Sequence, residues 1–348
     1  MPPSPLTAVV RRFPLLGRPR PDCPALPARI QEIADAVDTA RHKPDHGMAD
    51  AAHALNKAAL IASDAGMTDL AGHLCWQHID TYRHAGRPLT ILEARYLLEP
   101  VLNLARLQIR TDQGTAALRL LESMYYAVTR RCDLVVAEQT LPLANLLGEP
   151  ADRRQLRQWV WLQLIGEGVR ALALAGRWDD AAEHARHHNG IGDHLMEGRQ
   201  AEIITHCLRG DRQQARTLLA ESTTTETWER DIAAWLHLMC FRAGDEPSTP
   251  IGEVPLVTAA VARYDGCNST ANYASYRARL GLTIATLANN ISLSTATALL
   301  ARVAETRSAQ QTGTPPATCS ASAIPSRASP TPNVASSAAS PLRQVSGS

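Results

Sequence analysis

Residues 171–181 read ALALAGRWDDA, a helical stretch that ends at a glycine turn and is followed by a second helix with alanine at a close-contact position. Three other places repeat this arrangement: AGMTDLA at 65–71, TDQGTAA at 111–117 and RGDRQQA at 209–215. Gly66, Gly176 and Gly210 each stand five residues before the alanine, and the last two are 34 residues apart. The pattern predicts stacked helix pairs, which offer a binding surface rather than a reaction centre.

A spacing of 34 residues is the period of the tetratricopeptide repeat. We therefore predict an all-α protein, a tetratricopeptide-like right-handed superhelical solenoid of antiparallel helix pairs with disordered termini. The composition agrees, because 45% of the residues are apolar but only 4% are aromatic. Val, Ile and aromatic residues are too sparse for a large sheet, and no convincing alternation of apolar and polar residues is visible.

Three segments are expected along the chain. Residues 1–25 are rich in Pro and Arg and should form an extended arm, because proline cannot continue a helix and disfavours helix in the residue before it. Residues 26–307 should form the helical array, clearest over 47–245 and closed by capping helices over 253–307. Residues 308–348 are mostly Ser, Ala, Pro and Thr, and should be disordered because they bury too little apolar surface.

Helical periodicity places the individual helices within the array. The expected spans are 27–42, 48–64, 67–84, 89–110, 113–130, 151–174, 178–188, 195–208, 211–221, 226–242, 253–264, 270–289 and 293–306. Residues 189–192 are predicted to be a turn and residues 244–252 a loop. The segment 132–150 is less clear, because Pro142 should kink or end a helix there.

Charge and cysteine content limit the possible partners. The formal net charge of +1 gives no case for nucleic acid or an anionic membrane. The seven cysteines are scattered and never form a CxxC pair, which argues against a disulfide framework and favours a reducing cytoplasm. No apolar stretch reaches the roughly 18 residues of a membrane span. We expect a cytoplasmic protein without membrane contact and without direct DNA binding.

Several segments resemble a known group of proteins. They are AALIASDAG at 58–66, DLA at 69–71, LCW at 74–76, ALALAGRW at 171–178 with AA at 181–182, GIG at 190–192 and GRQ at 198–200. Over about residues 50–245 the chain resembles tetratricopeptide-like proteins of actinomycete type. Some members carry an N-terminal helix-turn-helix DNA-binding domain, and others lie among natural-product biosynthesis functions.

This resemblance implies a helical-repeat fold and a sensing or regulatory role, and it supplies no catalytic residues. Residues 1–46 are too few for a DNA-binding module of three to five helices, which argues against direct transcriptional control. The chain also lacks the Walker-type GxxxxGK[ST] motif and the GxSxG motif, and GIG at 190–192 lacks the third glycine of a dinucleotide site. We therefore expect no enzyme.

Candidate binding residues lie on the first helices of two successive pairs, which line the concave face of such an array. They are Asn56 and Lys57 on one helix, and Arg95, Asn103 and Arg106 on the next. These side chains could hold a carboxylate or an extended peptide backbone, as in carboxylate-clamp tetratricopeptide domains. The two asparagines do not occupy equivalent positions, so the analogy is loose. The alternative interpretation is an ordinary solvated helix face.

A histidine cluster offers the other candidate site. His184 and His188 lie one helical turn apart, the geometry in which two imidazoles share a metal, and His194 follows shortly after. A structural metal site needs further ligands, and no cysteine is near in the sequence. The alternative is a solvated helix end, where protonated histidines favour the helix dipole. We expect no metal or other cofactor, and His184, His188 and His194 remain the candidate ligands.

The expected function is that of a non-enzymatic adaptor or sensor that binds a protein or peptide and could be regulatory. One alternative is a sensor that resembles a transcription regulator but lacks its own helix-turn-helix domain. The other is a protein that binds a small molecule or a metal through the region 184–194.

Overall fold

The computed structural model describes residues 5–10, 24–42, 47–243, 250–266, 274–289 and 291–311. The helices are α1 (Pro5–Val10), α2 (Leu26–His42), α3 (Gly47–Asp64), α4 (Thr68–Arg83), α5 (Ile91–Arg110), α6 (Gly114–Arg130), α7 (Pro150–Leu174), α8 (Trp178–His187), α9 (Glu197–Leu208), α10 (Arg212–Ala220), α11 (Thr227–Arg242), α12 (Pro250–Gly266), α13 (Ala274–Ala288) and α14 (Leu293–Gln311). Strands β1 (Leu134–Val136) and β2 (Gln139–Leu141) complete the described elements. The described chain is therefore mostly helical, as predicted.

The four predicted turns close with the same pair of backbone hydrogen bonds. After α7, the amide of Arg177 donates to the carbonyl of Leu172 at 2.9 Å, and the amide of Gly176 donates to the carbonyl of Ala173 at 3.0 Å. This pair of bonds is the Schellman motif that ends many helices. The same two bonds recur at residues 62–67, 108–113 and 206–211.

The left-handed backbone at these turns explains the glycines. Gly66, Gly176 and Gly210 have φ angles of 77°, 73° and 79°, a conformation that glycine adopts without steric cost. At the turn that lacks a glycine in this position, Asp112 takes the same conformation with a φ of 59°. Aspartate tolerates this region better than most residues, so the turn survives without glycine.

The alanines that follow the turns are at helix contacts, as predicted. Ala71, Ala117, Ala181 and Ala215 each have 0% exposure. The amide of each one donates to the carbonyl four residues earlier, which closes the first turn of its helix. A methyl side chain allows the backbone of a neighbouring helix to approach closely, whereas a larger side chain there would overpack the contact.

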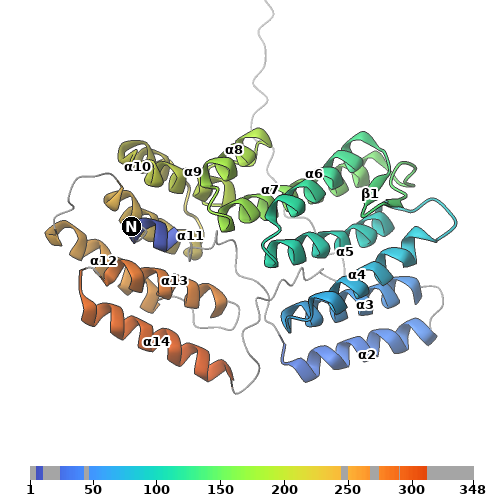
Figure 1. Cartoon of the computed structure of the whole chain (residues 1–348), viewed down its shortest axis with the longest axis horizontal. Coiled ribbons are helices and arrows are strands. Elements are labelled where there is room, and N and C mark those ends of the chain that lie inside the picture. Colours follow the sequence, from blue (N-terminus) through green and yellow to red (C-terminus); the bar gives the residue numbers. More distant parts are fainter. Residues whose placement is uncertain are drawn as a thin grey trace, which may run out of the picture.

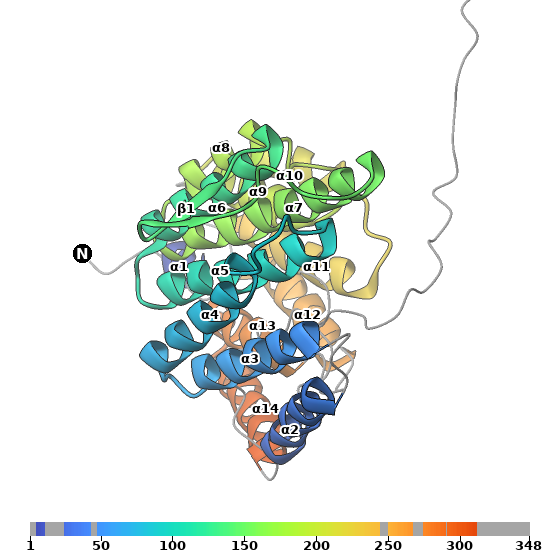
Figure 2. The ribbon, with the colours of Figure 1, turned by 90° about the vertical axis from the view of Figure 1, so that its right-hand side faces the viewer.

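The helices follow one another around an arch, with α2 at one foot and α14 at the other (Figure 1). Each helix from α2 to α14 packs against the next one along the chain. In addition, α3 packs against α5, α5 against α7, α7 against α9 and α9 against α11, and we call these five helices the odd-helix layer. The view turned by 90° shows α8 and α10 at the top and both feet at the bottom (Figure 2).

A short hairpin occupies part of the segment 132–150, which the sequence left unassigned. Strands β1 and β2 are antiparallel, with Leu134 opposite Leu141. Their two connecting residues, Ala137 and Glu138, have φ angles of 46° and 66°, as a tight two-residue hairpin turn requires. Strands of three residues are too short to show alternation in a sequence.

Three predicted boundaries are wrong. Residues 5–10 of the supposed extended arm form α1, which begins at Pro5; proline is tolerated in a first helical turn, where its missing N–H needs no partner. Helix α12 begins at Pro250, inside the predicted loop 244–252. Helix α14 continues to Gln311, past the predicted end of the array at 307. Residues 11–23 and 312–348 lie outside the described residues.

Two large clusters of buried apolar side chains hold the arch together. One is built mainly from α4 to α7 and the hairpin, and the other from α9 to α14 together with α1. Among the described helices, none combines the length and the hydropathy that crossing a bilayer would require.

Candidate binding site on the odd-helix layer

Five polar side chains follow one face of α5 at spacings of three or four residues, which makes them neighbours on the helix surface. They are Arg95, Glu99, Asn103, Arg106 and Arg110, and we call them the α5 polar stripe. Helix α5 begins at a capping box formed by Thr90 and Glu93. Because α5 packs against both α3 and α7, the stripe meets side chains from each of these neighbours.

Helix α3 meets the stripe through an amide pair and a charged pair. The Asn103 side-chain amide donates to Asn56 Oδ1 at 2.8 Å, and the two residues are only 8% and 5% exposed. The two asparagines, which the sequence did not place in equivalent positions, are thus in direct contact. Further along, Arg110 donates to the Ser63 hydroxyl and lies 3.6 Å from the Asp64 carboxylate.

Helix α7 meets the stripe through an ion pair and an aromatic ring. Arg106 Nε donates to the Glu167 carboxylate at 2.7 Å, and both side chains are largely buried. A second nitrogen of Arg106 donates to Asn103 Oδ1 at 3.3 Å. The Arg95 guanidinium lies over the Trp159 ring, 5.3 Å from its centroid. The stripe therefore connects three helices of the layer.

Glu99 is the buried acid of the stripe. Its carboxylate lies 3.6 Å from Arg95 Nε, and the residue is 6% exposed. Burial raises the pKa of the Glu99 carboxyl to about 7, and the guanidinium groups of Arg95 and Arg106 oppose this shift. The charge of the stripe therefore changes near neutral pH.

Raising the pH from about 5 to about 8 is expected to destabilise the protein through Glu99. The pKa of this carboxyl rises from an ordinary value of 4.5 to about 7 on folding, so the folded state keeps a proton that the unfolded state has lost. The stabilising contribution is complete below about pH 4.5 and disappears as the pH rises through about 7. A shift of this size corresponds to about 3 kcal/mol.

Urea unfolding of the unmodified chain and of Glu99→Gln at both pH values measures this contribution. The loss of stability with rising pH should be smaller in Glu99→Gln. Glu93→Gln is a matched control, because a hydrogen bond from Arg87 lowers the pKa of Glu93 to about 2 and this carboxyl is ionised throughout the range. An equal pH dependence in the unmodified chain and Glu99→Gln would show that Glu99 does not hold the proton.

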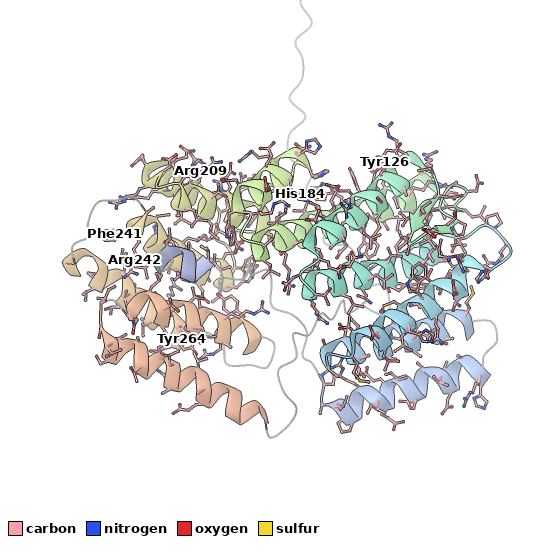
Figure 3. All side chains as sticks on the ribbon, viewed as in Figure 1. Tyr126, His184, Arg209, Phe241, Arg242 and Tyr264 are labelled. Carbon is pink, nitrogen blue, oxygen red and sulfur yellow. The ribbon has the colours of Figure 1, made fainter. Side chains whose placement is uncertain are left out.

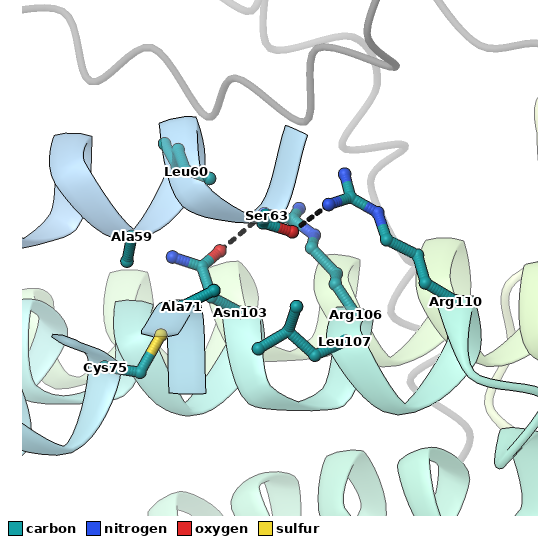
Figure 4. Close-up of a pocket in the computed structure, with 9 residues that line it drawn as sticks. All are labelled: Ala59, Leu60, Ser63, Ala71, Cys75, Asn103, Arg106, Leu107 and Arg110. Atoms are coloured by element: carbon teal, nitrogen blue, oxygen red, sulfur yellow. Dashed lines mark hydrogen bonds between the residues drawn. The ribbon is translucent and has the colours of Figure 1, made fainter. Parts of the chain in front are cut away.

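A small hollow with room for about one water molecule opens beside the stripe, between α3, α4 and α5 (Figure 4). Its polar lining is Ser63, Asn103, Arg106 and Arg110, and its apolar lining is Ala59, Leu60, Ala71, Cys75 and Leu107. Figure 4 shows the two arginine side chains entering from α5 and reaching Asn103 and Ser63. Guanidinium, amide and hydroxyl donors around a small hollow suit a carboxylate.

The predicted binding residues do not all belong to this site. Asn103 and Arg106 line the hollow, and Asn56 supports Asn103. Lys57 instead pairs with Glu32 of α2 at 2.6 Å, and Arg95 lies over Trp159. The prediction missed Glu99 and Arg110, which the spacing along α5 could have indicated, and also Ser63 and Glu167, for which the sequence contains no such signal.

Helix α1, near the N-terminus of the sequence, packs against helices of the C-terminal half of the arch. Helix α1 packs against α13 and α9, and it is the dark blue helix between α11 and α13 in Figure 1. Val9 and Val10 are 0% and 4% exposed, and they belong to the apolar cluster that contains Ile203 and Trp235. A short peptide segment thus packs against two helices that lie far along the chain, α9 at Glu197–Leu208 and α13 at Ala274–Ala288.

The histidine candidates separate into two places. His184 and His188 lie together on α8 and its C-cap, with their ring centroids 4.7 Å apart, and Figure 3 shows His184 on this part of the arch. The acid beside them is Glu122 of α6. His194 does not join them, because its Nδ1 lies 2.8 Å from the Glu229 carboxylate on α11.

Comparison of the chain with protein-family models, curated proteins and solved structures gave no match.

Proposed function

We propose that this chain is a non-enzymatic peptide-binding adaptor or sensor, built as a tetratricopeptide-like superhelical array of antiparallel helix pairs. The recurrent Schellman turns, the fully buried alanines and the contacts between successive odd-numbered helices support the repeat architecture. The observation that supports the binding role most directly is the position of α1, a short segment held by distant helices.

The contacts of α1 are those of a short helix packed against two longer ones. Two adjacent valines are buried while Leu6 is partly buried against the same cluster. Burying a valine side chain contributes about 1.5–3 kcal/mol, which is modest for a six-residue helix that must also lose chain entropy. Because α1 is covalently joined to the rest of the chain, it also has an advantage over a free peptide of the same sequence. A partner peptide can therefore replace α1 if it binds more tightly.

The hollow beside α5 adds a polar element to the same set of helices. Arg106, Arg110 and Ser63 converge there, and arginine recognises carboxylates with paired hydrogen bonds. We propose that this hollow takes one oxygen of a carboxylate, from an acidic side chain or from the C-terminus of a peptide partner, while the rest of the group stays at its mouth. The free thiols of Cys75, Cys132, Cys207 and Cys240 agree with the further proposal that the protein works in a reducing compartment.

Release of α1 from its seat is expected to open a site for an added peptide. In the full-length Val9→Asp/Val10→Asp variant, α1 should leave its seat, because burying two unpaired carboxylates is too costly. A labelled peptide of residues 1–12 should then bind this variant with a Kd of about micromolar order. It should bind the unmodified chain at least about tenfold more weakly, because the tethered α1 competes. Fluorescence anisotropy measures both affinities.

The matched control is the same peptide with both valines changed to aspartate, which should bind neither protein. The circular dichroism spectrum and melting temperature of the variant show whether the array stays folded. If the variant is folded and binds the unmodified peptide no better than the substituted peptide, the seat does not bind peptides in a sequence-dependent way and the proposal is wrong.

A further inference from the structure

Three potential metal ligands come together from α6 and α8, the second helices of two successive helix pairs. Glu122 lies on α6, His184 on α8, and His188 caps the C-terminus of α8. One ligand atom from each residue lies within 4.8 Å of the other two. Around a tetrahedral ion with bonds of about 2.0–2.2 Å, neighbouring ligand atoms are about 3.4 Å apart. Small side-chain rotations would therefore bring all three onto one ion.

The orientation of His184 is fixed by its contact with α7. His184 Nε2 lies 3.1 Å from the carbonyl oxygen of Leu164. A carbonyl can only accept a hydrogen bond, so Nε2 carries the proton and Nδ1 keeps the free electron pair. Ligating histidines usually have such a hydrogen bond to a second group, which fixes the ring and its tautomer. The ring can lie this close to α7 because residue 168 is glycine, where an added Cβ would stand 2.5 Å from Nε2.

His188 is held in place from both sides. Its carbonyl accepts a hydrogen bond from Trp161 Nε1 at 2.8 Å, and its ring meets those of His184 and His187 edge to face. These contacts hold the His188 ring beside His184, on the side of α8 that packs against α7 and faces Glu122 of α6.

We propose that Glu122, His184 and His188 form a binding site for one divalent first-row transition-metal ion, of which Zn²⁺ is the type. Two imidazoles and a carboxylate suit such ions, whereas Ca²⁺ and Mg²⁺ prefer oxygen ligands alone. Three protein ligands leave at least one position for water or for a partner's side chain. The ion would tie α6 to α8, and so one helix pair to the next, independently of any peptide bound elsewhere on the array.

Cobalt titration of the full-length chain tests the site. Co²⁺ replaces Zn²⁺ in such sites, and its absorption spectrum distinguishes nitrogen and oxygen ligands from thiolates, which matters because the chain has seven cysteines. After chelator treatment, we expect one equivalent of Co²⁺ to bind without a thiolate charge-transfer band. Glu122→Gln and His188→Gln should each weaken binding by about tenfold or more. Both positions are at least partly exposed, so these variants should fold.

Matched controls separate this site from other histidines. His194→Gln removes an imidazole that bonds to Glu229 outside the set and should keep the affinity. Gly168→Ala should weaken binding without removing a ligand, because the new Cβ displaces the His184 ring, whereas Gly166→Ala on the same helix meets nothing within 4 Å and should not. Absence of stoichiometric binding, a thiolate band, or unchanged affinity in Glu122→Gln and His188→Gln would each overturn the proposal.

Discussion

Replacing Glu167 with alanine is expected to lower the free energy of unfolding by about 3 kcal/mol or more. Glu167 accepts a hydrogen bond from Arg106 at 2.7 Å, and the two side chains are only 10% and 14% exposed. Without this carboxylate, the cationic guanidinium of Arg106 stays largely buried between α5 and α7 but loses the negative charge that offset the cost of its burial. Chemical denaturation at neutral pH measures the loss.

An exposed ion pair on the same protein provides the control. Arg177 and Asp180 lie 2.6 Å apart, but their side chains are 49% and 53% exposed, so Asp180→Ala should cost less than about 1 kcal/mol. Replacing both buried partners, as in Arg106→Met with Glu167→Leu, should recover most of the stability lost in Glu167→Ala, because no buried charge remains. If the Glu167 and Asp180 variants lose the same stability, the buried pair does not join the helices as described.

Gly198→Ala is expected to cost about 2–3 kcal/mol, an effect at the upper end for overpacking. A Cβ at residue 198 of α9 would lie 2.3 Å from the carbonyl oxygen of Gly190 and 3.2 Å from the Ala185 Cβ. A backbone oxygen cannot rotate away as a side chain can, so the loop 189–196 or α9 itself must move. Thermal and urea unfolding both report the loss.

Gly72→Ala on α4 is the matched control for this substitution. An added Cβ at residue 72 meets nothing within 4 Å, and alanine favours a helix over glycine by about 0.5–1 kcal/mol. This variant should therefore be as stable as the unmodified chain or slightly more stable. A Gly198→Ala protein that unfolds at the same denaturant concentration as Gly72→Ala would show that α9 does not pack against Gly190 as closely as described.

The turns were predictable because their signal is local. Each turn contains a residue with left-handed backbone, and the amide of the next residue bonds back to the preceding helix. The alanine stands four residues after that amide, so the whole signal lies within about ten residues. The glycines at 66, 176 and 210 therefore located three turns directly. Asp112 was found only because the residues around it have the same pattern.

The candidate site was predictable in part. The spacing of Arg95, Asn103 and Arg106 placed them on one face of a helix, and they do share that face with Glu99 and Arg110. Their partners come from other helices, and Asn56 and Asn103 are 47 residues apart. Which of two adjacent side chains on α3, Asn56 or Lys57, faces α5 depends on the rotation of α3 about its axis, which packing sets.

The sequence by itself determined the helical class, the four Schellman turns and the alanines at helix contacts, because these depend on backbone sterics and on spacing within one or two turns. Only the tertiary structure decided which polar groups meet, that Glu122 joins His184 and His188 while His194 bonds to Glu229, and that α1 lies between α9 and α13. These contacts join segments far apart in the chain. They are set by how the apolar faces of many helices pack together, and no local pattern encodes that packing.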